Sequence, residues 1–128
     1  MMSEFHNLEK IKFIKSAAYN MRRSSLLMTT HAGSGHLTSA LSAADLVAAL
    51  FFGIMKFDPD NPKNVYNDRF ILSKGHAASI LYAAWHELGK ISDEELLKYR
   101  SIDSPLEGHP TPNFWGTHAA TGSLGQGL

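Results

Sequence analysis

The chain has 128 residues, 44% of them hydrophobic and 19% charged, a composition typical of one folded soluble domain and not of a disordered segment. Twelve basic and twelve acidic residues give a formal net charge of zero, so no global field would attract nucleic acid or an anionic membrane. Cysteine is absent, which excludes disulfides and thiolate metal sites and is compatible with a cytoplasmic location. The longest apolar run, from Leu46 to Met55, is far shorter than the roughly 20 residues of a membrane-spanning helix.

Two helices are predicted in the first half of the chain. Apolar residues recur at three- and four-residue steps and predict an amphipathic helix over residues 7–28. The glycine-containing stretch 29–39 breaks this period and is expected to be a loop. Ser42 and Asp45 have the spacing of a capping box, which predicts that a second, mostly buried helix begins there.

A surface connection and one strand follow these helices. Residues 58–67 are rich in proline, asparagine and aspartate, which favour turns. The short apolar run Phe70-Ile71-Leu72 is typical of a strand buried on both faces of a parallel sheet. Helices and a strand in this order predict an α/β layer architecture. Because one strand does not complete a parallel sheet, the chain is expected to contain only the first part of this architecture.

The remainder of the chain is predicted to contain two helices and a long irregular segment. Residues 75–88 return to a helical period, and Gly89 is placed to end that helix. Ser92 and Glu95 form a capping box for a short helix that extends to Arg100. Residues 101–128 have no clear period until a glycine-rich stretch that resembles a loop entering a helix.

Three of the seven histidines, His36, His76 and His109, directly follow a glycine. Each lies in a predicted loop or at a helix start, where imidazoles can point together into a cleft and transfer protons near neutral pH. For any one of them taken alone, a loop histidine bonded to backbone is an equally good interpretation, and the occurrence of three together favours it less. No histidine pair has the spacing of a helical zinc site, although a site assembled from distant loops stays open.

The glycines from Gly122 to Gly127 could present backbone N–H groups to an anion at a helix start. Close helix packing explains the same glycines equally well. The segment matches neither the P-loop nor the dinucleotide fingerprint. It therefore suggests a phosphate site without establishing one.

Four motifs together closely resemble the transketolase family: Ser34-Gly-His36-Leu-Thr-Ser39, Asp68-Arg-Phe-Ile-Leu-Ser-Lys-Gly-His-Ala77, Glu107-Gly-His-Pro110 and Ala120-Thr-Gly-Ser-Leu-Gly-Gln-Gly-Leu128. Their order and spacing are similar to those of the family, and the likeness extends from the first predicted helix to the last residue. The resemblance implies an α/β fold, namely the three-layer α/β/α thiamine-diphosphate-binding fold. Residues 1–128 would be only the N-terminal part of its diphosphate-binding domain.

The resemblance also implies residue roles. His36 matches the family's substrate-side histidine near the reacting carbons, and His109 matches an active-site histidine that contacts the donor's hydroxyl groups. Five further positions match contacts to thiamine diphosphate: Ser39, His76, Gly122, Ser123 and Leu124.

The activity implied is transfer of a two-carbon ketol unit from a ketose phosphate to an aldose phosphate through thiamine diphosphate, in the pentose phosphate pathway. Mg²⁺ or Ca²⁺ would bind through ligands beyond Leu128, so no metal ligand is expected within the chain. The enzyme would be a cytoplasmic homodimer with its active site at the subunit interface. Sugar phosphates are the expected partners, nucleic acid and membrane are not, and the 128-residue piece alone is expected to be inactive.

Two alternatives to this activity stay open. The first is another thiamine-diphosphate enzyme, such as deoxyxylulose phosphate synthase or dihydroxyacetone synthase. The second is a non-catalytic truncated homologue that acts as an interaction protein. A ketol-transfer assay with pentose phosphates would separate the enzymes from one another.

Overall fold

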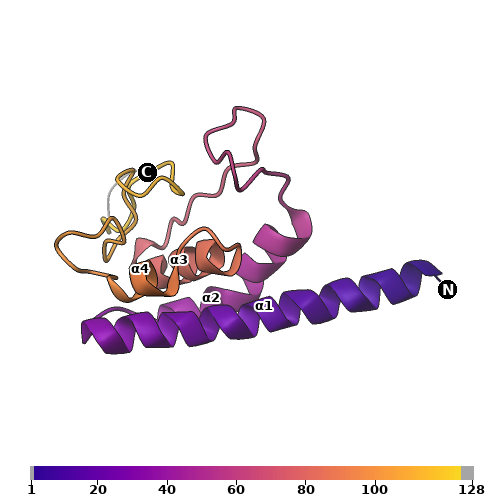
Figure 1. Ribbon diagram of the computed structural model, residues 1–128, viewed down its shortest axis with the longest axis horizontal. Coiled ribbons are helices and arrows are strands. Elements are labelled where there is room, and N and C mark those ends of the chain that lie inside the picture. Colours follow the sequence, from indigo (N-terminus) through magenta and orange to yellow (C-terminus); the bar gives the residue numbers. More distant parts are fainter. Residues whose placement is uncertain (1, 125–128) are drawn as a thin grey trace.

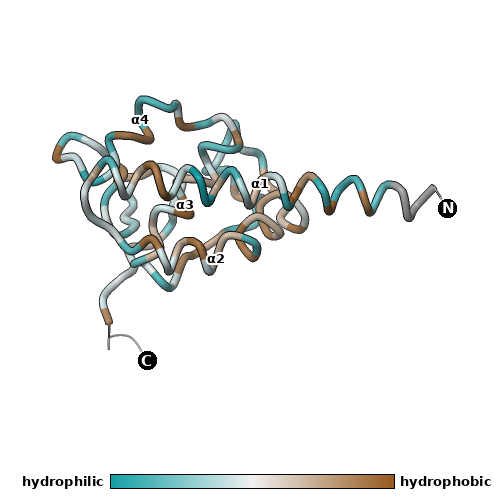
Figure 2. The backbone as a smooth tube through the Cα atoms, turned by 90° about the horizontal axis from the view of Figure 1, so that it is seen from below, coloured by the Kyte–Doolittle hydropathy of each residue, from teal (hydrophilic) through white to brown (hydrophobic). Residues whose placement is uncertain are grey.

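The computed structural model describes residues 2–124, and its regular structure is helical throughout that range (Figure 1). In chain order the elements are α1 (Met2–Ala32), α2 (Leu37–Ala49), a π-helical turn (Leu50–Ile54), a 3₁₀ turn (Gly75–Ala77), α3 (Ala78–Glu87) and α4 (Asp93–Leu97). The other helices pack along the C-terminal part of α1, and its N-terminal part projects beyond them (Figures 1 and 2). The core therefore lies between α1, α2 and α3.

Helix α1 is longer than predicted, and the loop after it is shorter. The helix ends where Gly33 adopts a positive φ of 63°, a conformation that glycine takes without strain. The Gly33 N–H donates to the Thr30 carbonyl at 3.2 Å, and the Ser34 N–H donates to the Thr29 carbonyl at 3.2 Å. This pair of bonds is the Schellman motif, which satisfies the last carbonyls of a helix.

The predicted start of the second helix is wrong. Helix α2 begins at Leu37, so Ser42 and Asp45 lie inside it. Instead of capping, the Asp45 carboxylate accepts two hydrogen bonds from Arg22 of α1, and these hold the pKa of Asp45 below its usual value. The buried apolar face of α2 begins before Ser42, the predicted capping residue. It consists of Ala40, Ala44, Val47 and Ala48.

The continuous helical stretch Leu37–Ile54 is long and apolar enough to cross a membrane by length and composition alone. A core helix of a soluble fold passes the same test. Here the stretch packs against α1 and α3, with Phe51 buried in the same core.

The predicted strand at residues 70–72 is not formed, and no strand occurs within residues 2–124. A strand needs a neighbouring segment to complete its hydrogen-bond ladder. The bond near this run is a local turn, from the Ser73 N–H to the Ile71 carbonyl at 3.1 Å. Ile71 is 55% exposed, so the run is not buried on both faces. The α/β expectation is therefore not met in this part of the chain.

The connection at residues 58–67 is confirmed as a series of turns tied by asparagine and aspartate side chains. The Asn67 side-chain carbonyl accepts from the Asp58 N–H at 3.0 Å, and its amide donates to the Asn61 carbonyl at 2.8 Å. These bonds close the connection without a regular element, as the composition indicated.

Helix α3 is the most deeply buried element, and every residue from Ala78 to Trp85 is buried. The predicted helix at residues 75–88 is thus confirmed, with Gly89 at a φ of 75° after its end. The irregular segment 101–124 is anchored on α3 because the Trp85 indole N–H donates to the Gly116 carbonyl at 3.1 Å. This anchoring fixes loops that contain no regular structure of their own.

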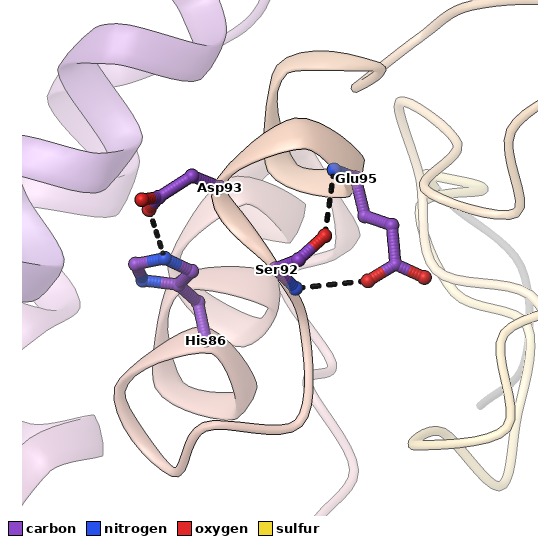
Figure 3. A network of polar contacts seen from close by, with 4 residues as sticks. All are labelled: His86, Ser92, Asp93 and Glu95. Carbon is purple, nitrogen blue, oxygen red and sulfur yellow. Dashed lines mark hydrogen bonds and ion pairs between the residues drawn. The ribbon is translucent and has the colours of Figure 1, made fainter.

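Helix α4 begins with the predicted capping box, shown in Figure 3. The Ser92 hydroxyl accepts from the Glu95 N–H at 3.2 Å, and the Glu95 carboxylate accepts from the Ser92 N–H at 2.8 Å. The bond that the carboxylate accepts from the Ser92 N–H is the main cause that holds the pKa of Glu95 below its usual value. The same figure shows His86 of α3 bonded to Asp93 at 2.8 Å, which ties α4 to α3. The helix ends at Leu97, earlier than predicted.

We expect Ser92→Ala to lower the free energy of unfolding by about 1 kcal/mol, because the Glu95 N–H loses its capping acceptor. Urea unfolding followed by circular dichroism measures the change. Ser101→Ala, at an exposed serine outside any helix, is the matched control. An equal midpoint in the two variants would show that the cap does not stabilise the chain.

Candidate functional site

Three loops bring the three glycine-linked histidines together. His36 precedes α2, His76 lies in the 3₁₀ turn before α3, and His109 lies in the irregular segment. The ring centroids of His36 and His76 are 4.7 Å apart, those of His76 and His109 are 4.6 Å apart, and those of His36 and His109 are 6.5 Å apart. The predicted gathering of these imidazoles is confirmed. We call these three residues the histidine cluster.

The absence of side chains on two glycines permits this approach. A Cβ on Gly75 would lie 2.6 Å from the Gly122 nitrogen and 2.6 Å from the Thr121 carbonyl carbon. A Cβ on Gly122, whose φ is 110°, would lie 2.4 Å from Cδ2 of His109. The backbone of residues 121–122 therefore packs directly between the 3₁₀ turn and the His109 ring. Gly122, which the family resemblance predicts to contact the cofactor, lies beside the histidine cluster.

Two buried polar atoms at this place have no hydrogen-bond partner within the described residues. They are Nε2 of His109 and Oγ1 of Thr121. Buried polar groups in folded proteins are nearly always bonded, to protein, water or ligand. These atoms therefore supply unused hydrogen-bonding capacity at the histidine cluster.

The environment of His109 favours its neutral form. Burial is the main cause that lowers the pKa of His109, and the neighbouring His76, His36 and Arg100 lower it further. A neutral imidazole has one donor and one acceptor nitrogen, so His109 can both bind hydroxyl groups and exchange protons near neutral pH.

Arg100 belongs to this site although the sequence analysis did not identify it. Its φ of 64° is rare for a residue other than glycine. A Cβ on Gly108 would lie 2.4 Å from its Nη1, so the guanidinium rests against the residue before His109. An open cleft of about 830 Å³ is lined by Arg100, His109 and polar side chains that include Thr111. No local motif marks Arg100, because its position depends on contacts made by the fold.

The other predicted cofactor contacts lie near the histidine cluster in sequence. Ser39 is half-buried on the first turn of α2, three residues after His36. Ser123 and Leu124 follow Gly122 and are exposed. In the described part of the chain no side-chain hydrogen bond joins Ser39 or Ser123 to the histidine cluster. Their roles as cofactor contacts, and that of Leu124, stay predictions.

The described histidine, aspartate and glutamate side chains do not form a group of three arranged to hold a metal ion. The histidine cluster is thus not arranged as a metal centre, and a zinc site assembled from distant loops finds no support in residues 2–124. What the cluster offers is imidazole nitrogens, backbone amides and a neighbouring guanidinium. These groups suit an organic ligand with hydroxyl and anionic parts.

A glycine-lined cluster of histidines beside an open cleft is the candidate ligand-binding centre of this chain, and comparison with known proteins identifies the family. Residues 14–128 match the family described as "Transketolase, thiamine diphosphate binding domain". The chain belongs to this family.

Named relatives agree with this assignment. The chain is 51% identical to "Transketolase" of Homo sapiens over 129 residues, which are 99% of this chain and 21% of that protein. It is 49% identical to "Transketolase-like protein 2" of Homo sapiens over 122 residues, which are 95% of this chain and 20% of that protein. The chain therefore spans about a fifth of the length of these curated relatives.

Solved structures of transketolases are similar as well. The fold superimposes on "Transketolase from Leishmania mexicana" with a TM-score of 0.82 and 30% identity, over 88% of this chain and 17% of that one. For the transketolase from Campylobacter jejuni the TM-score is 0.80 and the identity 34%, over 89% of this chain and 18% of that one. The helical arrangement described above is thus shared with transketolases.

Proposed function

We propose that this chain is the N-terminal part of a transketolase that transfers a two-carbon ketol unit from a ketose phosphate to an aldose phosphate in the pentose phosphate pathway. The observation that carries the proposal is the convergence of the His36, His76 and His109 rings, with the Gly122 backbone packed against His109. The curated relatives named transketolase support it over the related synthases. The complete domain would have the three-layer α/β/α fold, with its strands formed by residues outside the range 2–124.

The residues present fit thiamine diphosphate. The unpartnered His109 Nε2 and Thr121 Oγ1 provide hydrogen-bonding capacity, and the absence of a side chain on Gly122 lets the His109 ring lie directly against the main chain at this place. Thiamine diphosphate supplies a carbanion-stabilising centre when it is bound. The residues that would hold it are Ser39, His76, Gly122, Ser123 and Leu124.

His36 and His109 would serve the sugar substrate. Their imidazole nitrogens can hydrogen-bond the hydroxyl groups of the donor and move protons to and from its oxygens. The lowered pKa keeps His109 neutral at physiological pH, so it retains one accepting nitrogen. The guanidinium of Arg100 adds a positive charge to the same cleft, which favours an anionic substrate.

The remaining features of the proposed enzyme depend on residues outside this chain. We propose that Mg²⁺ or Ca²⁺ binds through ligands beyond Leu128, as the resemblance to the family implies. We propose a cytoplasmic homodimer with its active site at the subunit interface. The balanced net charge supports neither nucleic acid nor an anionic membrane as a partner.

In the proposed full-length enzyme, we expect His76→Ala to weaken thiamine diphosphate binding by about 10- to 150-fold. The reason is the loss of one hydrogen bond to a charged group, which contributes about 1.5–3 kcal/mol. Calorimetric titration of the apo-enzyme with cofactor measures the affinity. His31→Ala, at an exposed histidine on α1, is the control and should bind normally. Equal affinities of both variants would remove His76 from the cofactor site.

A further inference from the structure

The loop that carries His109 is closed by a side chain that the proposed reaction does not otherwise use. Residues 107–113 form neither helix nor strand, so no regular pattern of backbone hydrogen bonds fixes their conformation. The Glu107 Oε1 atom accepts a hydrogen bond from the Thr111 hydroxyl at 2.9 Å and another from the Asn113 amide at 2.9 Å. The acceptor precedes His109 and both donors follow it. The carboxylate therefore closes the loop around His109.

This closure is attached to the core of the molecule. The buried Tyr82 hydroxyl on α3 donates to the Glu107 carbonyl at 2.8 Å. Burial, followed by the neighbouring Tyr99 and Glu107, raises the pKa of Tyr82 far above its usual value, so this hydroxyl stays a donor at all physiological pH values. On the far side of the loop, the Thr121 N–H donates to the Pro110 carbonyl at 3.2 Å. The carbonyls of Glu107 and Pro110, on either side of His109, are thus each held by a hydrogen bond from another part of the chain. The Glu107 carboxylate adds bonds to Thr111 and Asn113 further along the loop.

We propose that Glu107 is a positioning residue whose carboxylate holds the His109 ring within the histidine cluster. The importance of His109 for the reaction rests on the proposed function. The positioning of its ring by Glu107 does not. Glu107 acts through bonds and not through its charge on the ring: the charged or titratable groups that influence His109 are His76, His36 and Arg100. Two hydrogen bonds that one Glu107 oxygen accepts, from donors four and six residues further along the chain, restrict the loop between them whether or not the acceptor is charged.

The geometry allows a sharp test, because both hydrogen bonds end on the same oxygen of Glu107. Glu107→Gln keeps one carbonyl oxygen that can accept both bonds while it removes the charge. Glu107→Ala removes both bonds. Thr111→Val, with little change in side-chain volume, removes the bond to Glu107 together with the longer bond that the Thr111 hydroxyl accepts from the Asn113 backbone N–H at 3.4 Å. Glu94→Ala, at an exposed carboxylate on α4, is the control for loss of a surface acid.

The measurement is a pH titration of the His109 ring resonances by NMR in the 128-residue chain, with ring-to-ring contacts to His76 recorded on the same samples. We expect the native chain, Glu107→Gln and Glu94→Ala to keep the lowered His109 pKa and the contact. In Glu107→Ala and Thr111→Val the pKa of His109 should rise toward that of an ordinary histidine and the contact with His76 should weaken, because the ring leaves its half-buried position.

Two outcomes would overturn the proposal. One is an unchanged His109 titration in Thr111→Val and in a folded Glu107→Ala chain, because the carboxylate bonds would then not position the ring. The other is a Glu107→Gln chain that behaves like Glu107→Ala, because the charge would then be the cause. If circular dichroism shows that Glu107→Ala unfolds, the comparison of Thr111→Val with Glu107→Gln decides alone. None of these readouts requires cofactor binding or turnover, so failure of the proposed function would be seen separately.

Discussion

Replacing His109 by alanine in the proposed full-length enzyme should lower kcat, or kcat/KM for the ketose donor, by about 10²- to 10⁴-fold while thiamine diphosphate still binds. His36→Ala should act in the same direction, because the two rings share the histidine cluster. In the proposed function both rings bind donor hydroxyl groups and move protons. The test is steady-state kinetics of ketol transfer at saturating cofactor.

His118→Ala, at an exposed histidine outside the cluster, is the control and should retain normal turnover. The pH dependence gives a second readout. Because the pKa of His109 is lowered, its neutral form persists into more acidic solution than that of an ordinary histidine, and the activity that needs it should be lost only below the usual histidine range. A His109→Ala enzyme with normal kcat and KM would exclude the residue from the site.

The chain of residues 1–128 on its own should show no ketol transfer and little affinity for thiamine diphosphate, even with Mg²⁺ present. In the proposed enzyme the metal ligands lie outside residues 1–128, so no bound cation would compensate the negative charge of the diphosphate in this chain. The histidine cluster and the Gly122 backbone form only part of a cofactor shell. Calorimetric titration of the chain with cofactor, with and without Mg²⁺, is the direct measurement. Micromolar binding would show that residues 1–128 form a self-sufficient module.

Signals carried by neighbouring residues were sufficient for several elements. The Ser92 and Glu95 pair predicted the capping box of α4, because both bonds join residues three apart in the chain. Gly89 marked the end of α3 because its positive φ is a local property. The Gly-His pattern and the family motifs also indicated which histidines belong to the site. These features depend on short stretches of chain, which a sequence contains in full.

Local signals failed where tertiary contacts compete with them. The capping pattern at Ser42 and Asp45 was overridden because burial of an earlier apolar face starts α2 at Leu37, and Arg22 from α1 takes the Asp45 carboxylate. The apolar run around Ile71 has strand character, but a strand forms only with a paired neighbour. Adjacent residues identify neither Arg22, which binds the Asp45 carboxylate, nor the strand that would have to pair with the run around Ile71.

The sequence by itself therefore determined the family, most helices and the three histidines of the candidate site. Only the tertiary structure decided that these rings lie within contact distance, that Arg100 rests against Gly108, and that Glu107 closes the loop around His109. The physical reason is the sequence distance between the participants. Helix caps and turns form between near neighbours, whereas ring contacts and a shifted pKa depend on groups that only folding brings together.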